Sequence, residues 1–132
     1  MIFPTRAQIV RHNFEVIKAT RGFFKPPENL INPNSLDWVL ETIQYPLFNQ
    51  YEAIQEKASL LSWTIIRDHI FFDGNKRTGM ISMNSFLTIN GYFLVYTSEE
   101  IIQIARHVAD SNNKESSKQD LVNWIIQHRA NY

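Results

Sequence analysis

The sequence contains no cysteine, only four glycines among its 132 residues, and no excess of charge of either sign. Without cysteine, disulfides and thiolate metal sites are excluded, which fits a reducing compartment. So few glycines also argue against a turn-rich β-protein. Thirteen basic and thirteen acidic residues cancel. Net charge therefore gives no reason to expect direct nucleic-acid binding or an acidic membrane surface as the main partner.

Long apolar runs are absent as well. No stretch of about eighteen apolar residues could span a membrane, and the N-terminus lacks the pattern of a cleaved signal sequence. The composition, 44% apolar and 13% aromatic, is that of a globular protein. No repeat or linker-like tract divides the chain. We therefore expect one domain over residues 1–132, located in the cytoplasm.

Apolar residues recur at helical spacing along most of the chain, which predicts an all-α fold of about six helices. Four of these helices are expected to begin at the capping residues Thr5, Ser35, Thr97 and Ser116. The other two, over residues 53–68 and 78–90, are apolar around much of their circumference and should lie at the centre of the fold. Residues 92–96 form a short piece that is expected to be extended.

The segment that joins the two central helices carries most of the chemistry. It reads His-Ile-Phe-Phe-Asp-Gly-Asn-Lys-Arg-Thr-Gly over residues 69–79, and a helical pattern resumes directly after it. The first N–H groups of a helix lack internal partners and the helix dipole favours an anion there. Gly74 would let the backbone approach a ligand, and Asn75, Lys76 and Arg77 would add donors. The segment is predicted to be a phosphate-binding loop in a compact single-domain fold.

Two residues of this loop are candidates for catalysis and metal binding. His69 is the candidate general base, because an imidazole titrates near neutral pH and can take a proton from a hydroxyl. Its alternative role is to cap the preceding helix. Asp73 could hold Mg²⁺, which takes oxygen ligands and shares them with substrate phosphates. It could equally be a turn residue that accepts backbone N–H groups, and the two roles are compatible. Asn75 could fix the loop as much as bind a nucleotide.

The loop resembles that of the Fic/Doc family, most closely its Doc (death-on-curing) toxins. The Doc form reads His-x-Phe-x-Asp-Ala/Gly-Asn-Lys-Arg, and the chain matches every fixed position through His69, Phe71, Asp73, Gly74, Asn75, Lys76 and Arg77. It departs from the Fic form, His-Pro-Phe-x-x-Gly-Asn-Gly-Arg-x-x-Arg, at three positions, Ile70, Lys76 and Met80. The flanking residues 56–61 and 86–92 also resemble Doc-type sequences.

The resemblance implies an activity and a set of partners. It implies that His69 takes the proton of a protein hydroxyl, that Asp73 binds Mg²⁺, and that residues 74–77 surround the phosphates of ATP. In the Doc group a lysine at the position of Lys76 goes with an inverted nucleotide and transfer of the γ-phosphate, so the resemblance implies a Ser/Thr protein kinase. The implied target is elongation factor Tu, with a block of translation, and the implied restraint is a Phd-like antitoxin whose C-terminal segment folds as a helix in a groove.

Three questions stay open at this level. The chain could instead transfer a nucleotide monophosphate (AMP) to a protein hydroxyl, as Fic enzymes do, although Lys76 and Met80 both argue against it. It could also be a non-catalytic module that binds a nucleotide or a partner. Tyr45, Phe48 and Tyr51 are candidates for a flap that holds the target, or they simply cover the edge of the core.

Overall fold

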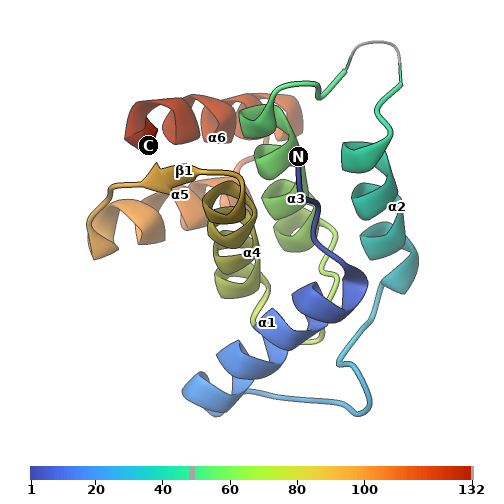
Figure 1. Cartoon of the computed structure of the whole chain (residues 1–132). Coiled ribbons are helices and arrows are strands. Elements are labelled where there is room, and N and C mark those ends of the chain that lie inside the picture. Colours follow the sequence, from blue (N-terminus) through green and yellow to red (C-terminus); the bar gives the residue numbers. More distant parts are fainter. Residues whose placement is uncertain (48–49, 132) are drawn as a thin grey trace.

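The computed structural model describes residues 1–47 and 50–131, and within them six helices and two short strands are present (Figure 1). The elements are α1 (Arg6–Thr20), α2 (Pro33–Gln44), α3 (Ile54–Arg67), α4 (Asn75–Ile89), β1 (Tyr92–Leu94), α5 (Ser98–Asp110), α6 (Lys114–His128) and β2 (Arg129–Asn131). The predicted all-α class with about six helices is confirmed. Across the described part of the chain, no helix combines the length and apolar character needed to cross a membrane.

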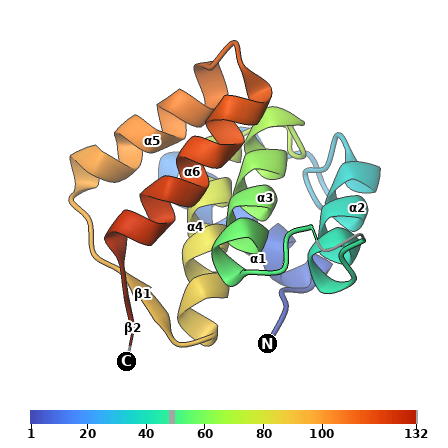
Figure 2. The ribbon, with the colours of Figure 1, turned by 90° about the horizontal axis from the view of Figure 1, so that it is seen from above.

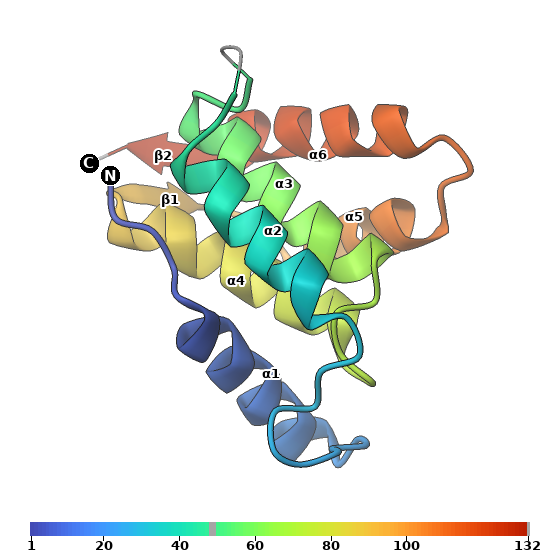
Figure 3. The ribbon, with the colours of Figure 1, turned by 90° about the vertical axis from the view of Figure 1, so that its right-hand side faces the viewer.

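Helices α3 and α4 form the centre of the molecule. Figure 2 shows them between α5 and α6 on one side and α2 on the other, and α1 packs across α4 (Figure 3). Ten of the fourteen residues of α3 are buried, which agrees with the predicted central position. The two helices approach closely at Gly79, where a Cβ atom would lie 2.8 Å from Ile66 Cγ1. The end of α3 and the start of α4 therefore carry the loop of residues 68–74 on a rigid support.

Three predicted helix starts are wrong. Helix α4 begins at Asn75, three residues before the expected Thr78, so Lys76 and Arg77 belong to its first turn. Helix α2 begins at Pro33 rather than after Ser35, because the fixed φ of proline suits the first helical position. Helix α6 begins at Lys114, where Asn113 Oδ1 accepts the N–H of Ser116. The capping boxes at Thr5 and Thr97 are confirmed.

The strand pairing was not predicted in full. The expected extended piece is present as β1, which pairs antiparallel with β2 in the register Tyr92↔Asn131. Nothing in the local pattern of residues 129–131 indicated a strand, and β2 forms only because the end of α6 returns to β1. The sheet lies at the opposite end of α4 from the loop (Figure 1).

The described residues of the aromatic segment before α3 do not lie near the loop. The fourteen residues of α3 span roughly 21 Å, and the connection that contains Tyr45 enters the helix at the end away from His69 (Figure 1). Tyr51 packs against the hydrophobic core and its hydroxyl accepts a hydrogen bond from Lys118 Nζ, 3.1 Å away. It therefore covers the edge of the core. Phe48 lies outside the described residues.

Candidate active site

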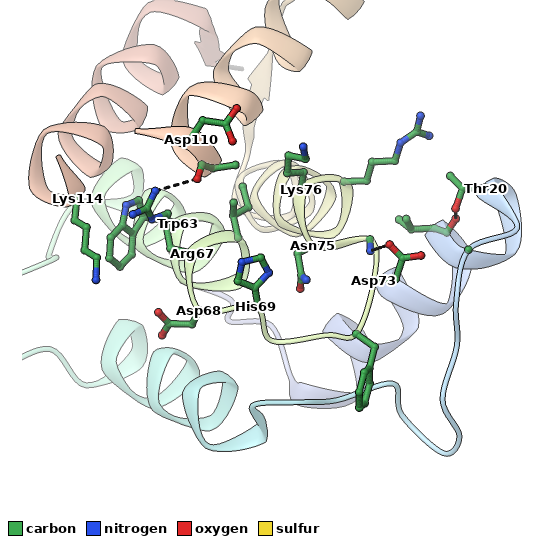
Figure 4. Close-up of a pocket in the computed structure, with 17 residues that line it drawn as sticks. Thr20, Trp63, Arg67, Asp68, His69, Asp73, Asn75, Lys76, Asp110 and Lys114 are labelled. Atoms are coloured by element: carbon green, nitrogen blue, oxygen red, sulfur yellow. Dashed lines mark hydrogen bonds between the residues drawn. The ribbon is translucent and has the colours of Figure 1, made fainter. Parts of the chain in front are cut away.

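An open cleft of about 930 Å³ runs along the loop between α3 and α4. His69 lies at its middle, Asp73 and Thr20 lie toward one end, and Trp63 and Lys114 lie toward the other (Figure 4). The walls come from α1, the segment after it, the end of α3, the first turn of α4, the end of α5 and the start of α6. The cleft therefore brings together all of the predicted site residues: His69, Asp73, Gly74, Asn75, Lys76 and Arg77.

His69 is presented to the cleft by an unusual backbone. Its φ of 45° lies in the left-handed region, which residues other than glycine rarely adopt. Asn32 stabilises this turn, because its side-chain amide donates to the carbonyl oxygens of Asp68 (2.6 Å) and His69 (3.0 Å). The His69 side chain is exposed, and its ring forms no hydrogen bond with any residue that the structure describes. The ring does not cap α3, and its nitrogens are available to a ligand.

Both carboxylate oxygens of Asp73 accept hydrogen bonds from backbone N–H groups. Oδ2 accepts the N–H of Phe23 at 2.9 Å, and Oδ1 accepts the N–H of Gly74 at 2.8 Å. The turn role expected of this residue is therefore present. Among the described residues no group of three or more His, Cys, Asp and Glu side chains could hold a metal ion. A lone carboxylate whose oxygens each keep a free lone pair fits Mg²⁺, which is commonly bound by one or two carboxylates together with substrate phosphates.

The start of α4 offers an anion site. Gly74 is the N-cap with φ of 79°, and its carbonyl accepts the N–H of Thr78 at 2.9 Å. The N–H groups of Asn75, Lys76 and Arg77 have no hydrogen-bond acceptor in the described part of the chain, and all three residues line the cleft. Lys76 and Arg77 are exposed and form no ion pair there. Three free N–H groups, a positive helix end and two cations favour a phosphate chain at this point.

The side chain of Asn75 holds the loop closed. Its Oδ1 accepts the N–H of Phe71 and its Nδ2 donates to the carbonyl of Phe71, each at 2.9 Å. Phe71 is fully buried, as expected for the residue that anchors the loop in the core. These contacts leave one N–H of the Asn75 amide unused, so the loop can offer this N–H to a ligand beside its backbone N–H groups.

Sequence reasoning missed the residues that fasten the loop to the N-terminal part of the chain. Asn13 and Asn29 are at most 1% exposed, and Asn29 Nδ2 donates to Asn13 Oδ1 at 3.0 Å. Asn13 Nδ2 in turn donates to the carbonyl of Asp73 at 2.9 Å and to Thr78 Oγ1 at 3.1 Å. A signal was available, because Asn13 falls at helical spacing among the apolar residues of α1, where a buried amide needs partners.

The remaining histidines lie outside the cleft, as expected. His12 Nδ1 lies 3.1 Å from Ser82 Oγ, and burial lowers the pKa of His12 below its usual value. His107 pairs with Asp120, and His128 pairs with Glu100. These contacts join helices to one another, and none of the three residues lines the cleft.

The comparison with known families agrees with this geometry. No curated protein matches the chain. A sequence model of the Fic/DOC family matches residues 5–87, which include α1, α2, α3, the whole loop and most of α4. The match covers well over half of the chain and does not separate the Doc form from the Fic form. On this match, the chain belongs to the Fic/DOC family.

Proposed function

We propose that this protein is a Doc-type kinase that transfers the γ-phosphate of ATP to a Ser or Thr hydroxyl of another protein. Fic/DOC proteins generally transfer nucleotide-derived groups to proteins and typically use ATP and Mg²⁺. The observation that carries the proposal is the unpaired, exposed Lys76 in the first turn of α4, beside the free N–H groups of residues 75–77. A cation at a helix start is unfavourable unless an anion is bound there.

The proposed reaction assigns one role to each group of the cleft. The hydroxyl oxygen of the target attacks the γ-phosphorus of ATP and forms a new O–P bond. The bond between the γ-phosphorus and the β–γ bridging oxygen breaks, and its electron pair leaves with ADP. His69 accepts the hydroxyl proton, since its ring faces the cleft with no competing hydrogen bond among the described residues. The N–H groups of residues 75–77 with Lys76 and Arg77 stabilise the charge on the phosphoryl oxygens.

Asp73 is the proposed magnesium ligand. The Asp73 carboxylate would hold the ion, which would supply positive charge to neutralise the phosphates. The carboxylate lies at the edge of the cleft beside the start of α4 (Figure 4). Its hydrogen bonds to two backbone N–H groups keep it in place without using all of its lone pairs.

The proposed target is elongation factor Tu, and the proposed effect is a block of translation in the cytoplasm. Both come from the resemblance to Doc toxins. The cleft supports a protein substrate because it is open, so that a loop from another protein can reach His69. The residues around the phosphates do not determine which protein is modified.

The proposed restraint is a Phd-like antitoxin that docks as a helix. A hollow of about 690 Å³ lies between α1, α4 and α5, with Ile81, Ile101 and Ile102 on its walls. Lys76 and Arg77 line both this hollow and the cleft. An amphipathic helix with acidic side chains would fit it, because the apolar face would cover the isoleucines and the acidic groups would meet the two cations. Such a helix would compete with ATP for the same charges.

The test is intact-mass spectrometry of purified elongation factor Tu after incubation with this protein, ATP and Mg²⁺. One added phosphate per molecule is expected with the wild type and none with His69→Ala. His107→Ala is the matched control, since it removes an exposed histidine that lies outside the cleft and should leave the transfer unchanged. Unmodified factor would exclude this target, and a phosphoprotein search in a cell extract would then identify another.

The alternative function, transfer of AMP, is distinguished by the same experiment. An added nucleotide monophosphate in place of a phosphate would show that Lys76 does not determine which group is transferred. The non-catalytic alternative predicts tight nucleotide or partner binding with no change in the mass of any protein. The exposed His69 ring, which forms no hydrogen bond with any described residue, argues against this alternative. A module that only binds a ligand does not need a general base at the centre of the cleft.

A further inference from the structure

The carboxylate of Asp73 occupies the place that a side chain at residue 22 would take. A Cβ atom on Gly22 would lie 2.5 Å from Asp73 Oδ2 and 3.2 Å from Ile17 Cδ1. The backbone of Gly22 is not in the left-handed region, so its conformation does not require glycine. Glycine at this position instead leaves space, above all for the carboxylate of Asp73.

The next residue holds the same carboxylate. The N–H of Phe23 donates to Asp73 Oδ2 at 2.9 Å, whereas the Phe23 side chain is 58% exposed and packs edge-on against the ring of Phe72. The contribution of Phe23 to Asp73 therefore comes from its backbone. Gly22 supplies the space and Phe23 supplies the donor.

Two buried asparagines close this arrangement into a ring of hydrogen bonds. Asn29 Nδ2 donates to the carbonyl of Phe23 at 3.3 Å and to Asn13 Oδ1 at 3.0 Å. Asn13 Nδ2 donates to the carbonyl of Asp73 at 2.9 Å. The backbone of Asp73 and the backbone of Phe23 are thus fixed to each other through two buried amides, while the Phe23 N–H fixes the carboxylate. Buried amides with all their partners resist rotation, because breaking one bond leaves a polar group unpaired.

We infer that Gly22, the Phe23 peptide, Asn13 and Asn29 form a positioning clamp that aims the Asp73 carboxylate at the divalent cation before the nucleotide binds. This inference rests on the proposed function, in which Asp73 is the magnesium ligand. Groups that orient a metal ligand without touching the metal commonly change metal affinity by about 10- to 100-fold. The clamp places such groups far from the ligand along the chain, sixty positions away for Asn13 in α1 and fifty for Phe23 in the segment after it.

The experiment measures how strongly Mg²⁺ is coupled to nucleotide binding. A non-hydrolysable ATP analogue is titrated into the protein by calorimetry, once with Mg²⁺ and once with EDTA, and the ratio of the two dissociation constants is the coupling. In the wild type Mg²⁺ should tighten binding. In Gly22→Ala the displaced carboxylate should reduce this coupling by about 10- to 100-fold, with the dissociation constant in EDTA unchanged. The melting temperature should change little, because Gly22 and the Phe23 N–H that would lose the carboxylate are both exposed to water and alanine suits the backbone of residue 22.

A second pair of variants separates the donor from the side chain. Phe23→Ala keeps the N–H and should preserve the magnesium coupling, whereas Phe23→Pro removes the N–H and should weaken the coupling as Gly22→Ala does. Wild-type coupling in both Gly22→Ala and Phe23→Pro would overturn the clamp and leave the proposed kinase standing. A wild type that binds no nucleotide in either buffer would overturn both. Coupling that falls as expected in a protein that transfers AMP would support the clamp and exclude the proposed reaction.

Discussion

The side chain of Asn75 is hydrogen-bonded to both polar backbone groups of Phe71, to its N–H and to its carbonyl, each at 2.9 Å. One amide in the first turn of α4 thereby closes the loop back onto the residue that anchors it in the core. The residues between them, which include Asp73, have their conformation set by this closure. The amide was expected to fix the loop or to bind the nucleotide, and the contact accounts for the first role.

Asn75→Ala is therefore expected to destabilise the protein. The N–H and carbonyl of a fully buried residue would lose their partners, at a cost of about 1–3 kcal/mol in the free energy of unfolding. Urea denaturation measures this change. Asn75→Asp keeps an acceptor for the Phe71 N–H but places a second carboxylate oxygen against the Phe71 carbonyl, so it should also be less stable than the wild type. Wild-type stability in Asn75→Ala would show that these two contacts contribute little to stability.

Much of the candidate site could be predicted from the sequence because its chemistry is local. The predicted site residues fall between residues 69 and 77, and a helix start with free N–H groups follows from general rules of helix geometry. The same holds for the capping boxes at Thr5 and Thr97, which involve residues three positions apart. Local patterns of this kind determine their own structure, and the fold class follows from helical periodicity for the same reason.

The contacts that orient the site join distant residues and left weaker signals. Asn13 and Asp73 are sixty positions apart, and Asn32 contacts the carbonyls of Asp68 and His69 across more than thirty. No spacing rule connects such residues. The late prediction for the start of α4 has a different cause: the apolar helical pattern resumes only after the loop, whereas the helix itself begins with the polar residues 75–77.

Lys76→Gln should separate stability from binding. Removing a cation from the first turn of α4 should raise the free energy of unfolding by about 0.3–1 kcal/mol. It should weaken ATP binding by about 10- to 100-fold, as expected for the loss of one charge-assisted hydrogen bond. Lys18→Gln is the matched control, since Lys18 lies in the last turn of α1 and outside both the cleft and the hollow. It should lower stability slightly and leave binding unchanged.

The two outcomes for Lys76 depend on the same charge. Unchanged ATP affinity in Lys76→Gln would contradict a phosphate contact at this position. Lower stability of Lys76→Gln would show that the ammonium group of Lys76 already has a stabilising contact in the nucleotide-free protein. Calorimetry for binding and urea denaturation for stability answer the two questions independently.

Gly79→Ala should destabilise the protein although alanine is the better helix former. The added Cβ would lie 2.8 Å from Ile66 Cγ1 and 3.1 Å from the carbonyl oxygen of Ser62. Overpacking of this kind costs about 1–3 kcal/mol, which exceeds the gain in helix propensity of about 1 kcal/mol. Because His69 follows the end of α3 and the phosphate site lies at the start of α4, the forced separation should also slow phosphate transfer. Ile81→Ala, at an exposed position of the same helix, should change stability much less.

Acid is expected to destabilise the protein by protonating Glu100, whose carboxylate links the start of α5 to the end of α6. The Thr97 N–H and then the hydrogen bond with His128, 2.9 Å away, lower the pKa of Glu100 below its ordinary value of 4.5. A carboxyl with a lower pKa in the folded state stabilises the protein above the unfolded pKa, and this stabilisation is lost as the pH falls through the folded pKa.

The melting temperature of the wild type should therefore fall more steeply below pH 4.5 than that of Glu100→Gln. Glu99→Gln, in the same helical turn but without the Thr97 contact, should follow the wild type. Identical curves for the wild type and Glu100→Gln would mean that these hydrogen bonds do not stabilise the carboxylate in solution.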